Sequence, residues 1–496
     1  MRRIEGFYSS LLTPYPSQYM LRRTKIVATL GPSSNDPKVL DRLIEAGIDV
    51  VRLNFSHGKP EDHIQRAEMV RSLARARGRA VGVLVDLQGP KIRIGKFEQG
   101  KITLGNGDKF ILDADCELGN QERVGLDYKD LPKDVTRGSI LLLDDGRIVM
   151  WVEEVRGNEI VCQVRQGGVL SNNKGINRQG GGLSAAALTE KDMEDIQTAV
   201  ALKADYIAVS FPRNAADMML ARELMTAAGG HSLLVAKIER AEAIPALEEI
   251  LDASDAIMVA RGDLGVEVGD AAVPALQKKM IRLARERNKL AITATQMMES
   301  MITSPIPTRA EVSDVANAVI DGTDAVMLSA ETAAGQYPVE AVQAMDRVCM
   351  EAEKEIEVSP ASMRMTRNYQ TIDESIAMAA IYTANHLGVK AIAALTQSGS
   401  TALWMSRIAT AVPIYALTPQ VETRRKVTLF RGVYPINFKM FTHDPELLLR
   451  EAEDELRRRG AVRDGDMIVL TIGEPIGKSG GTNTMKLVRV GEHRKA

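Results

Sequence analysis

The segment "VLVDLQGPKIRIG", residues 83–95, joins a short apolar run to two cations. The apolar run is typical of a buried strand, and it ends at Asp86. A Gly-Pro pair then breaks the chain before Lys91 and Arg93. A single polar residue at a strand end can be a simple cap. Whether Asp86, Lys91 and Arg93 together have a function therefore depends on the rest of the chain.

Two similar runs precede this segment, "KIVATLGP" at 25–32 and "DVVRLNFS" at 49–56. Helix-like segments at 37–47 and 63–78 separate them from each other and from the strand-like run at 80–89. Short, almost continuously apolar strands that alternate with helices are typical of parallel strands covered by helices. This part of the chain therefore predicts three consecutive βα units.

The alternation stops between residues 91 and 185. Short runs of alternating apolar and polar residues occur there, with turn sequences at 105–107, 145–146 and 157–158. They predict an antiparallel β module. The module ends in the glycine-dense stretch 172–183, which we expect to be a hinge or a mobile loop.

From Thr189 the alternation resumes, with "TEKD" as a helix-start signal. Five strand-like runs follow, at 205–212, 232–239, 255–263, 290–296 and 323–332. Together with the first three they predict an α/β fold, a closed (β/α)8 TIM barrel with an antiparallel β lid domain inserted after strand three. Beyond about residue 360, further alternating helices and strands predict a separate open α/β domain.

These patterns divide the 496 residues into four parts. We expect an N-terminal arm at 1–21, a catalytic barrel at 22–89 and 186–358, an inserted β lid domain at 90–185 and a C-terminal α/β regulatory domain at 359–496. The arm precedes the first strand-like run, so we expect it to pack on the body or on a neighbouring subunit.

The composition excludes several classes of partner. Lys plus Arg number 63 against 65 Asp plus Glu, and the net charge of -2 argues against nucleic acid or an acidic membrane as a partner. The three cysteines are too far apart for a disulfide framework or a zinc site, which favours the reducing cytoplasm. The sequence also shows no secretory signal pattern and no apolar run of about 20 residues.

In a (β/α)8 barrel the active site forms at the carboxyl ends of the strands. Polar residues gather at those ends: Arg52, Asn54, Ser56, Asp86, Lys237, Glu239, Arg261, Asp263, Thr295, Gln296, Ser329 and Glu331. A polar cap explains any one of them, but a whole ring of buried charges needs partners or a function.

Two kinds of charge in this ring indicate its chemistry. Glu239 and Asp263 offer hard oxygen ligands, which suit Mg²⁺ or Mn²⁺ held by few protein groups. Arg52, Arg93 and Lys237 suit phosphate and carboxylate groups. The residues thus predict a divalent-metal enzyme that acts on a small phosphorylated acid, with the inserted domain as a lid that excludes water.

Long motifs along the chain resemble those of the pyruvate kinase family. They are "NFSHG" (54–58), "DLQGPKIR" (86–93), "AKIE" (236–239), "MVARGDLG" (258–265), "ATQMMESM" (294–301), "PTRAEVSDVANAV" (307–319) and "DAVMLSAETAAGQYP" (324–338). The resemblance is to the bacterial type and runs from about residue 22 to the end. It implies transfer of the phosphoryl group of phosphoenolpyruvate to ADP, followed by protonation of the enolate to pyruvate.

The resemblance also implies roles for single residues. Glu239 and Asp263 would hold the divalent metal, Lys237 would neutralise the phosphoryl group and the enolate oxygen, and Arg52 would grip the phosphate. The implied substrate contacts are Arg52, Arg93, Lys237, Gly262, Asp263 and Thr295, the backbone amides near Gly262 lying at a helix start.

The implied proton donor is Thr295, with Ser329 in a water relay, because a threonine alone is a poor acid. The implied ADP contacts are Asn54, His57 and Lys174. His57 also fits a plain strand-end cap. In the stretch that carries Lys174 the chain departs from the family, since "GINRQGGG" replaces an Asn-Leu-Pro-Gly turn and favours a looser lid.

The family has a regulatory site in its third domain, and "LTQSGST" at 395–401 matches its position. The candidate effector contacts are Thr396, Gln397, Ser398, Gly399, Ser400 and Thr401, whose hydroxyls and amides would cradle the phosphate of a sugar phosphate or a nucleotide monophosphate. A plain βα turn is the alternative interpretation. The resemblance further implies a homotetramer.

The segment 83–95 also bears on the dependence of the activity on K⁺. Many relatives bind K⁺ through the positions that match Asn54, Ser56, Asp86 and the carbonyl of Leu87, and they carry a glutamate where this chain has Lys91. We interpret the Lys91 ammonium as a substitute for K⁺, so that K⁺ is not required. A solvated lysine at the lid hinge is the alternative.

Two other functions share parts of this pattern. A Mg²⁺-dependent barrel lyase or aldolase that acts on pyruvate enolates needs the same carboxylates and arginine, but neither a lid nor ADP. A metabolite sensor built on an inactive barrel needs the loss of a catalytic group. Since Lys237, Glu239, Asp263 and Thr295 are all present, the sequence argues against the sensor.

Overall fold

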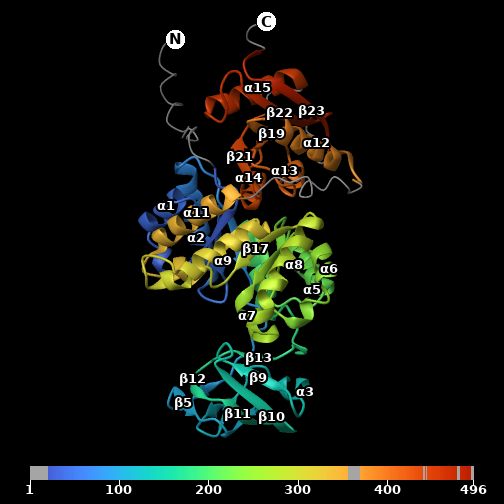
Figure 1. The fold of residues 1–496 in the computed structure, drawn as a ribbon. Helices are drawn as coiled ribbons and strands as arrows, with labels where there is room; N and C mark the ends of the chain where they lie inside the picture. The colour runs from blue at the N-terminus through green and yellow to red at the C-terminus, as the bar shows by residue number, and fades with distance from the viewer. Residues whose placement is uncertain (1–20, 356–368, 440–441, 443, 477–480, 493–496) are drawn as a thin grey trace.

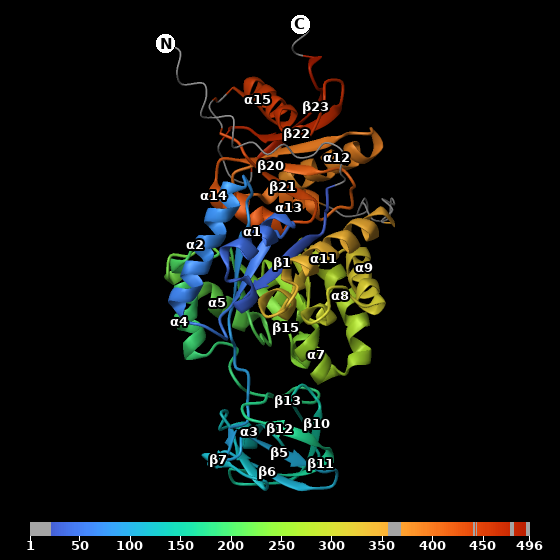
Figure 2. The same ribbon diagram turned by 90° about the vertical axis from the view of Figure 1, so that its left-hand side faces the viewer.

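The computed structural model describes residues 21–355, 369–439, 442, 444–476 and 481–492. The predicted N-terminal arm, apart from its last residue, lies outside the described residues, as does the start of the predicted C-terminal domain. The barrel lies in the middle of the molecule, between the inserted domain at one end and the C-terminal domain at the other (Figures 1 and 2).

Eight parallel strands close into a barrel in the order β1-β18-β17-β16-β15-β14-β3-β2, which confirms the predicted fold. The strands are β1 (Lys25–Leu30), β2 (Val50–Asn54), β3 (Gly82–Asp86), β14 (Tyr206–Val209), β15 (Leu233–Ile238), β16 (Ala256–Ala260), β17 (Leu290–Ala294) and β18 (Ala325–Leu328).

Helices cover the outside of the barrel: α1 (Pro37–Glu45), α2 (Pro60–Ala76), α4 (Glu190–Ala201), α5 (Ala215–Ala227), α6 (Leu247–Ala253), α7 (Arg261–Val268), α8 (Val273–Glu286), α9 (Arg309–Asp321), α10 (Ala330–Ala333) and α11 (Pro338–Ala352). The predicted start signal at Thr189 is confirmed, since its hydroxyl accepts a hydrogen bond from the backbone N–H of Asp192 and caps α4.

Several strands end earlier than the sequence patterns predict. The predicted strand 255–263 ends at Ala260, and α7 begins at the next residue. The predicted strand 323–332 likewise ends at Leu328, just before α10. The polar motif residues Arg261, Asp263 and Glu331 therefore lie in the first turns of α7 and α10, at the barrel mouth and not in its apolar wall.

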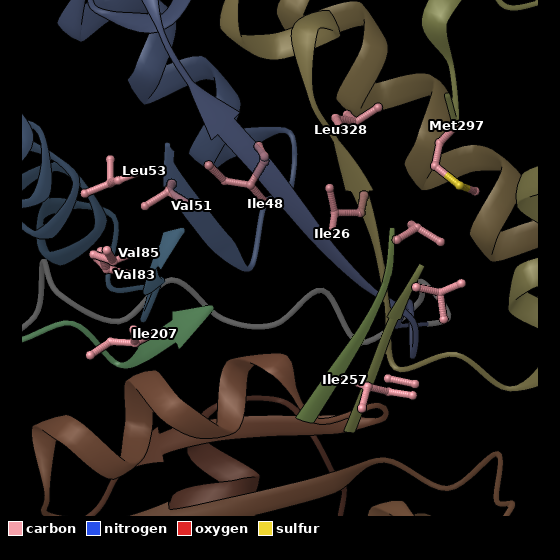
Figure 3. Close-up of a cluster of buried hydrophobic side chains, with 14 of the residues drawn as sticks. Ile26, Ile48, Val51, Leu53, Val83, Val85, Ile207, Ile257, Met297 and Leu328 are labelled. Atoms are coloured by element: carbon pink, nitrogen blue, oxygen red, sulfur yellow. The ribbon is translucent and has the colours of Figure 1, made fainter. Parts of the chain in front are cut away.

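The barrel strands alternate between two apolar cores. Ile26, Val51, Val83, Val85 and Ile207 face the helices, and Figure 3 shows them in this outer core. The residues between them in sequence, among them Val27, Val50, Leu84 and Ala208, belong to a second core that fills the barrel and continues into the C-terminal domain. This period of two decides which residues reach the mouth of the barrel.

The inserted domain contains β4 (Lys96–Phe97), β5 (Lys101–Leu104), β6 (Lys109–Asp113), β7 (Leu118–Gly119), β8 (Arg123–Gly125), α3 (Leu131–Asp134), β9 (Ile140–Leu143), β10 (Ile148–Arg156), β11 (Glu159–Gln166), β12 (Gly168–Ser171) and β13 (Ile176–Arg178). Its main sheet has the order β13-β9-β10-β11-β6-β8. Most pairs are antiparallel as expected, but β6 pairs with β8, and β4 with β7, in parallel.

Two local predictions for this domain need correction. The turn at 105–107 does not close a hairpin, because β5 pairs with β12 while β6 pairs with β11. The glycine-dense stretch 172–183 is not wholly a loop, because Ile176–Arg178 forms β13 and pairs with β9. The backbone pairing of β13 outweighs the turn tendency of the neighbouring glycines.

The C-terminal domain is an open sheet of order β21-β20-β19-β22-β23. It contains α12 (Ile372–His386), β19 (Ala391–Leu395), α13 (Ser400–Ser406), β20 (Ile414–Thr418), α14 (Val421–Lys426), β21 (Val433–Asn437), α15 (Pro445–Arg458), β22 (Met467–Gly473) and β23 (Thr482–Arg489). The strand-like runs at 389–396, 412–418 and 466–473 predict three of these strands. Strand β21 and the antiparallel edge strand β23 are additional. In the described part of the chain, no helix combines the length and the apolar character needed to cross a bilayer.

Candidate active site

Five polar side chains enter the mouth of the barrel because of strand alternation. Each lies two residues after an inward-facing core residue, and the five are Thr29, Arg52, Asp86, Ser210 and Lys237. Neighbouring strands bring them together: Thr29 is in register with Arg52, and Asp86 with Ala208. They form the central cluster of the site.

Asp86 links the two cations of this cluster. Its Oδ2 lies 2.6 Å from Nε of Arg52, and its Oδ1 lies 3.1 Å from Nζ of Lys237. The carboxylate is only 1% exposed. Burial raises the pKa of Asp86, but Lys237 and Arg52 outweigh it and hold that pKa below its usual value. Asp86 is therefore an ionised anchor and not a proton donor.

Lys237 is held by three partners. Its ammonium lies 2.9 Å from Oε1 of Glu239 and donates to Oγ of Ser210 at 2.7 Å, in addition to its contact with Asp86. Burial lowers the pKa of Lys237, but the two carboxylates hold it above the usual value. The side chain thus provides a fixed positive charge and does not serve as a base.

Two carboxylates could hold a divalent metal beside this cluster. Glu239 is 2% exposed, and its Oε2 accepts the backbone N–H of Phe211 at 3.0 Å. Burial raises the pKa of Glu239, Lys237 opposes the rise, and Asp263 adds to it because it lies nearby. Asp263 lies in the first turn of α7, where its Oδ1 is 3.2 Å from Nζ of Lys91.

The described residues contain no group of three or more candidate metal ligands. A pair of carboxylates is what Mg²⁺ commonly uses, since it keeps several waters and takes further oxygens from a bound substrate. The donor set of Glu239 and Asp263 therefore fits a catalytic Mg²⁺ or Mn²⁺ better than a structural metal.

Thr295 adopts a strained backbone conformation at the end of β17. Its φ is 67°, and the next residue, Gln296, has φ of 54°. Such angles are rare for a β-branched residue and occur where the surroundings enforce them. Arg261 supplies that support, since its Nη2 donates to the carbonyl of Thr295 at 2.6 Å while its Nη1 is paired with Asp314. The Thr295 hydroxyl donates to Ala294 O at 2.6 Å.

The helix start at Gly262 is present as expected, but its amide is already engaged. The N–H of Gly262 donates to Oγ1 of Thr295 at 2.9 Å. Ser329 lies at the end of β18, where its backbone N–H donates to Glu331 Oε2 at 2.7 Å. In the described residues no hydrogen bond joins Ser329 to Thr295.

Of the residues expected to contact ADP, Asn54 ends β2 in register with Asp86, whereas His57 and Lys174 lie on loops. Asn54 Oδ1 accepts the N–H of Ser56 at 3.1 Å, and the carbonyl of His57 lies 2.9 Å from His63 Nε2. Lys174 pairs within the inserted domain, with 2.7 Å from its Nζ to Oδ1 of Asp144.

Arg93 lies where the chain enters the inserted domain. Its backbone bridges to Gly175, and its N–H donates to Asp127 at 2.7 Å.

The oxygens at the expected K⁺ position already have protein donors. The Leu87 carbonyl accepts the Ser210 hydroxyl at 2.7 Å. Both oxygens of Asp86 face cations, and Asn54 Oδ1 accepts the amide of Ser56.

The candidate effector residues Thr396–Thr401 follow β19 directly, and the last two of them begin α13. Its groups bond mainly to one another: Gly399 N–H donates to Thr396 Oγ1 at 2.9 Å, and the hydroxyls of Ser398 and Ser400 are 2.7 Å apart. The Gln397 carbonyl accepts from Thr423, and the Thr401 hydroxyl contacts Thr482.

Comparisons with known proteins agree with this geometry. A family model described as "Pyruvate kinase, barrel domain" matches residues 21–342, and one described as "Pyruvate kinase, alpha/beta domain" matches residues 374–488. The chain belongs to the pyruvate kinase family. It is 54% identical over 476 residues to "Pyruvate kinase II" of Salmonella typhimurium, covering 95% of this chain and 99% of the relative.

Further relatives share this full-length similarity. A pyruvate kinase of Haemophilus influenzae is 55% identical over 459 residues, covering 91% of this chain and 96% of the relative. A crystal structure of a pyruvate kinase from Cryptosporidium parvum superposes with a TM-score of 0.89 at 36% identity, covering 95% of this chain and 96% of that chain. The chain is therefore a phosphotransferase of the pyruvate kinase family.

Two members of the central cluster escaped the sequence reasoning. Ser210 contacts Lys237, Asp86 and the Leu87 carbonyl, and Thr29 accepts from Arg52 at 3.1 Å. Neither is charged, so neither stands out among strand-end residues. The signal was the period of two, which places both on the inward face of their strands.

A buried glutamate lies where the inserted domain meets the barrel of this pyruvate kinase family member. Glu267 accepts the backbone N–H of Ala241 at 2.8 Å and the side-chain amide of Asn177 at 3.4 Å, and its carbonyl accepts the N–H of Gly180 at 3.1 Å. Burial raises the pKa of Glu267 to about 7, and neighbouring Glu242 adds to the rise.

This contact predicts a pH dependence of stability. Because the folded-state pKa of Glu267 is about 7, above the value of about 4.3 in an unfolded chain, the native state loses stability as the pH rises between those values. The Glu267→Gln variant does not have this pH-dependent loss. The difference between its midpoint temperature of unfolding and that of the wild type should therefore grow in favour of the variant as the pH rises from 5 to about 8. The exposed Glu249→Gln on α6 serves as the control. If the difference in midpoint temperature between Glu267→Gln and the wild type stays constant with pH, the raised pKa of Glu267 is contradicted.

Proposed function

We propose that this chain catalyses transfer of the phosphoryl group of phosphoenolpyruvate to ADP, giving pyruvate and ATP. The observation that carries the proposal is the Lys237 ammonium, whose side chain is only 11% exposed and is held by Asp86, Glu239 and Ser210 at the barrel mouth. Phosphoryl transfer asks for positioning and charge compensation more than for covalent chemistry, and a fixed cation supplies both.

The divalent metal proposed at Glu239 and Asp263 is Mg²⁺ or Mn²⁺. When bound, it would neutralise charge on the substrate carboxylate side and on the phosphoryl group. The two carboxylates orient that ion, and Lys91 beside Asp263 offsets their combined negative charge.

The residues proposed to surround the substrate bind different parts of it, the cationic side chains its phosphoryl group and the backbone amides its carboxylate. Arg52, held by Asp86, presents its remaining guanidinium donors to the phosphoryl group, and Lys237 places its charge between phosphate and enolate oxygen. Arg93 adds positive charge from the entry to the inserted domain. The amides of Gly262 and Asp263 at the start of α7 receive the substrate carboxylate, which requires the Thr295 hydroxyl to release Gly262.

Thr295 is the proposed proton donor to the enolate carbon. Its hydroxyl lies between the Ala294 carbonyl and the Gly262 amide, so it turns toward the substrate when the amide is taken up. A threonine hydroxyl is a weak acid, and Ser329 would supply the proton through water. For ADP, the proposed contacts are Asn54, His57 and Lys174, the last from the inserted domain.

K⁺ is not needed in this proposal. The Lys91 ammonium lies at the metal-binding carboxylate Asp263, and the oxygens of Asp86, Leu87 and Asn54 that would bind K⁺ already accept protein hydrogen bonds or face cations. The positive charge is thus part of the polypeptide.

Several further properties belong to the same proposal. We infer that the loop Thr396–Thr401 binds a sugar phosphate or a nucleotide monophosphate, that the chain forms a homotetramer, and that it works in the cytoplasm. The division into a barrel at 22–89 and 186–358, an inserted domain at 90–185 and a C-terminal domain at 359–496 is the domain scheme that this proposal assumes.

A coupled assay tests the reaction directly. With phosphoenolpyruvate, ADP and Mg²⁺ the purified chain should release pyruvate and ATP in equal amounts, and omission of ADP or of divalent metal should reduce pyruvate release to background. Pyruvate release without ADP would instead indicate a lyase, and no release under any of these conditions would contradict the proposal.

A further inference from the structure

One short turn contacts both the central cation and a metal-binding carboxylate of the candidate active site. Ser210 directly follows β14 and is 1% exposed. Its hydroxyl accepts a hydrogen bond from Nζ of Lys237 and donates one to the Leu87 carbonyl, both at 2.7 Å. The next residue, Phe211, donates its backbone N–H to Oε2 of Glu239 at 3.0 Å. We call Ser210 and Phe211 the β14 turn.

The backbone of the β14 turn is strained. Phe211 has φ of 58°, a left-handed angle that an aromatic residue seldom adopts and that persists only where the surroundings enforce it. Its ring supplies part of that support, because Phe211 is 7% exposed and the ring centre lies 5.5 Å from the guanidinium carbon of Arg240. With an ordinary negative φ the N–H of Phe211 would point elsewhere. The strained angle therefore directs this N–H to Glu239.

Gly89 closes over the β14 turn from the loop that follows β3. Its φ is 67°, and a Cβ added to it would lie 2.7 Å from Cβ of Ser210 and 3.0 Å from a ring carbon of Phe211. The N–H of Gly89 donates to Oδ1 of buried Asp192 at 3.0 Å, which fixes the glycine in this place. A side chain at residue 89 would push the turn aside, so the absence of one lets the loop hold the turn by close contact.

We propose that the β14 turn positions two charged groups of the reaction. Ser210 directs the ammonium of Lys237. The backbone of Phe211 directs the carboxylate of Glu239. Because both groups are held by one rigid turn, the cation and the metal ligand keep one relative placement, which phosphoryl transfer requires. This inference rests on the proposed function and deepens it by naming what holds its charged groups in place.

Ser210→Ala tests the role of the hydroxyl. Without it the Lys237 ammonium is left to its two carboxylate partners, so kcat for pyruvate formation should fall at least about tenfold. The half-saturating phosphoenolpyruvate concentration should change less than about threefold, since the loss is one of orientation in the transition state.

Ser254→Ala is the matched control for this variant. Ser254 is also 1% exposed and also donates to a backbone carbonyl, that of Ile250 at 2.6 Å, but it precedes β16 at the opposite end of the barrel. The control should lose a similar amount of stability and keep the wild-type kcat, because both variants lose one buried hydroxyl.

Phe211→Gly and Phe211→Ala test the role of the backbone. Both variants lose the ring, so both should unfold at a lower temperature than the wild type. Glycine adopts a left-handed φ freely and keeps the N–H on Glu239, whereas alanine without the supporting ring relaxes to a negative φ and releases it. Calorimetry with Mn²⁺ alone on the full chain should therefore show at least about tenfold weaker binding in Phe211→Ala than in Phe211→Gly, as is usual when a group that orients a metal ligand is lost.

Gly89→Ala tests the contact that holds the turn. It should lower both kcat and Mn²⁺ affinity at least about tenfold, because the added Cβ displaces both residues of the turn. Gly388→Ala, on the loop after α12, is the control, since its φ is 65° and an added Cβ would meet nothing within 4 Å. Both variants place alanine at a left-handed φ, so the difference between them reports the displaced turn.

Four results would overturn the proposal. They are more than about half the wild-type kcat in Ser210→Ala, equal Mn²⁺ affinity in Phe211→Gly and Phe211→Ala, wild-type behaviour of Gly89→Ala, and no binding of Mn²⁺ to the wild type. The Mn²⁺ measurements need no turnover. A wild type that binds Mn²⁺ but forms no pyruvate would therefore contradict the proposed function, while the two Phe211 variants would still decide the role of the turn.

Discussion

Lys237→Met is expected to lower kcat at least about a thousandfold while leaving the fold intact, because it deletes a fixed charge aimed at the developing negative charge. The ammonium has no substitute nearby, since Arg52 is tied to Asp86 and Lys91 to Asp263. The half-saturating phosphoenolpyruvate concentration should change much less than kcat, because the charge matters most in the transition state.

The measurement is the steady-state rate of pyruvate formation, with unfolding followed by circular dichroism. Lys279→Met, an exposed lysine on α8, is the matched control and should keep wild-type activity. The Lys237→Met variant should also unfold at a lower temperature than the wild type, since Asp86 and Glu239 lose their cationic partner. A folded variant that retains more than about a tenth of the wild-type kcat would contradict the role of Lys237.

Lys91→Glu is expected to create a requirement for K⁺. The new carboxylate would lie beside Asp263, where the lysine now stands 3.2 Å from Oδ1, and two adjacent anions need a cation between them. Without K⁺ the variant should lose activity at least about a hundredfold, the size expected for one misplaced charge at the reacting centre. K⁺ should restore most of that loss.

Activity in K⁺ and in a bulky organic cation, at equal ionic strength, provides the measurement. The wild type should differ little between the two salts. Lys96→Glu, which reverses an exposed lysine on β4, should behave like the wild type. Strong activation of the wild type by K⁺ would refute the interpretation of Lys91, and a K⁺-insensitive Lys91→Glu variant would contradict it as well.

Much of the fold followed from local pattern. The eight strand-like runs, the place of the insertion after Asp86 and the helix cap at Thr189 depend on spacing and on local capping, and the structure confirms them. The family motifs carried the function further than composition did. The pairing of β5 with β12 was not accessible, because partner choice in a sheet depends on distant strands.

The sequence by itself determined which side chains face the barrel mouth, because a strand places every second residue on the same side. Arg52, Asp86 and Lys237 could be assigned there without coordinates. Only the tertiary structure decided which atoms meet: Lys91 reaches Asp263 across 172 residues of chain, and Ser210 joins Lys237 to the Leu87 carbonyl. It also brought the arginines of α2, α14 and α15 into one cleft. These contacts depend on barrel closure and domain packing, since local periodicity fixes the face of a residue but not its distance from another strand or domain.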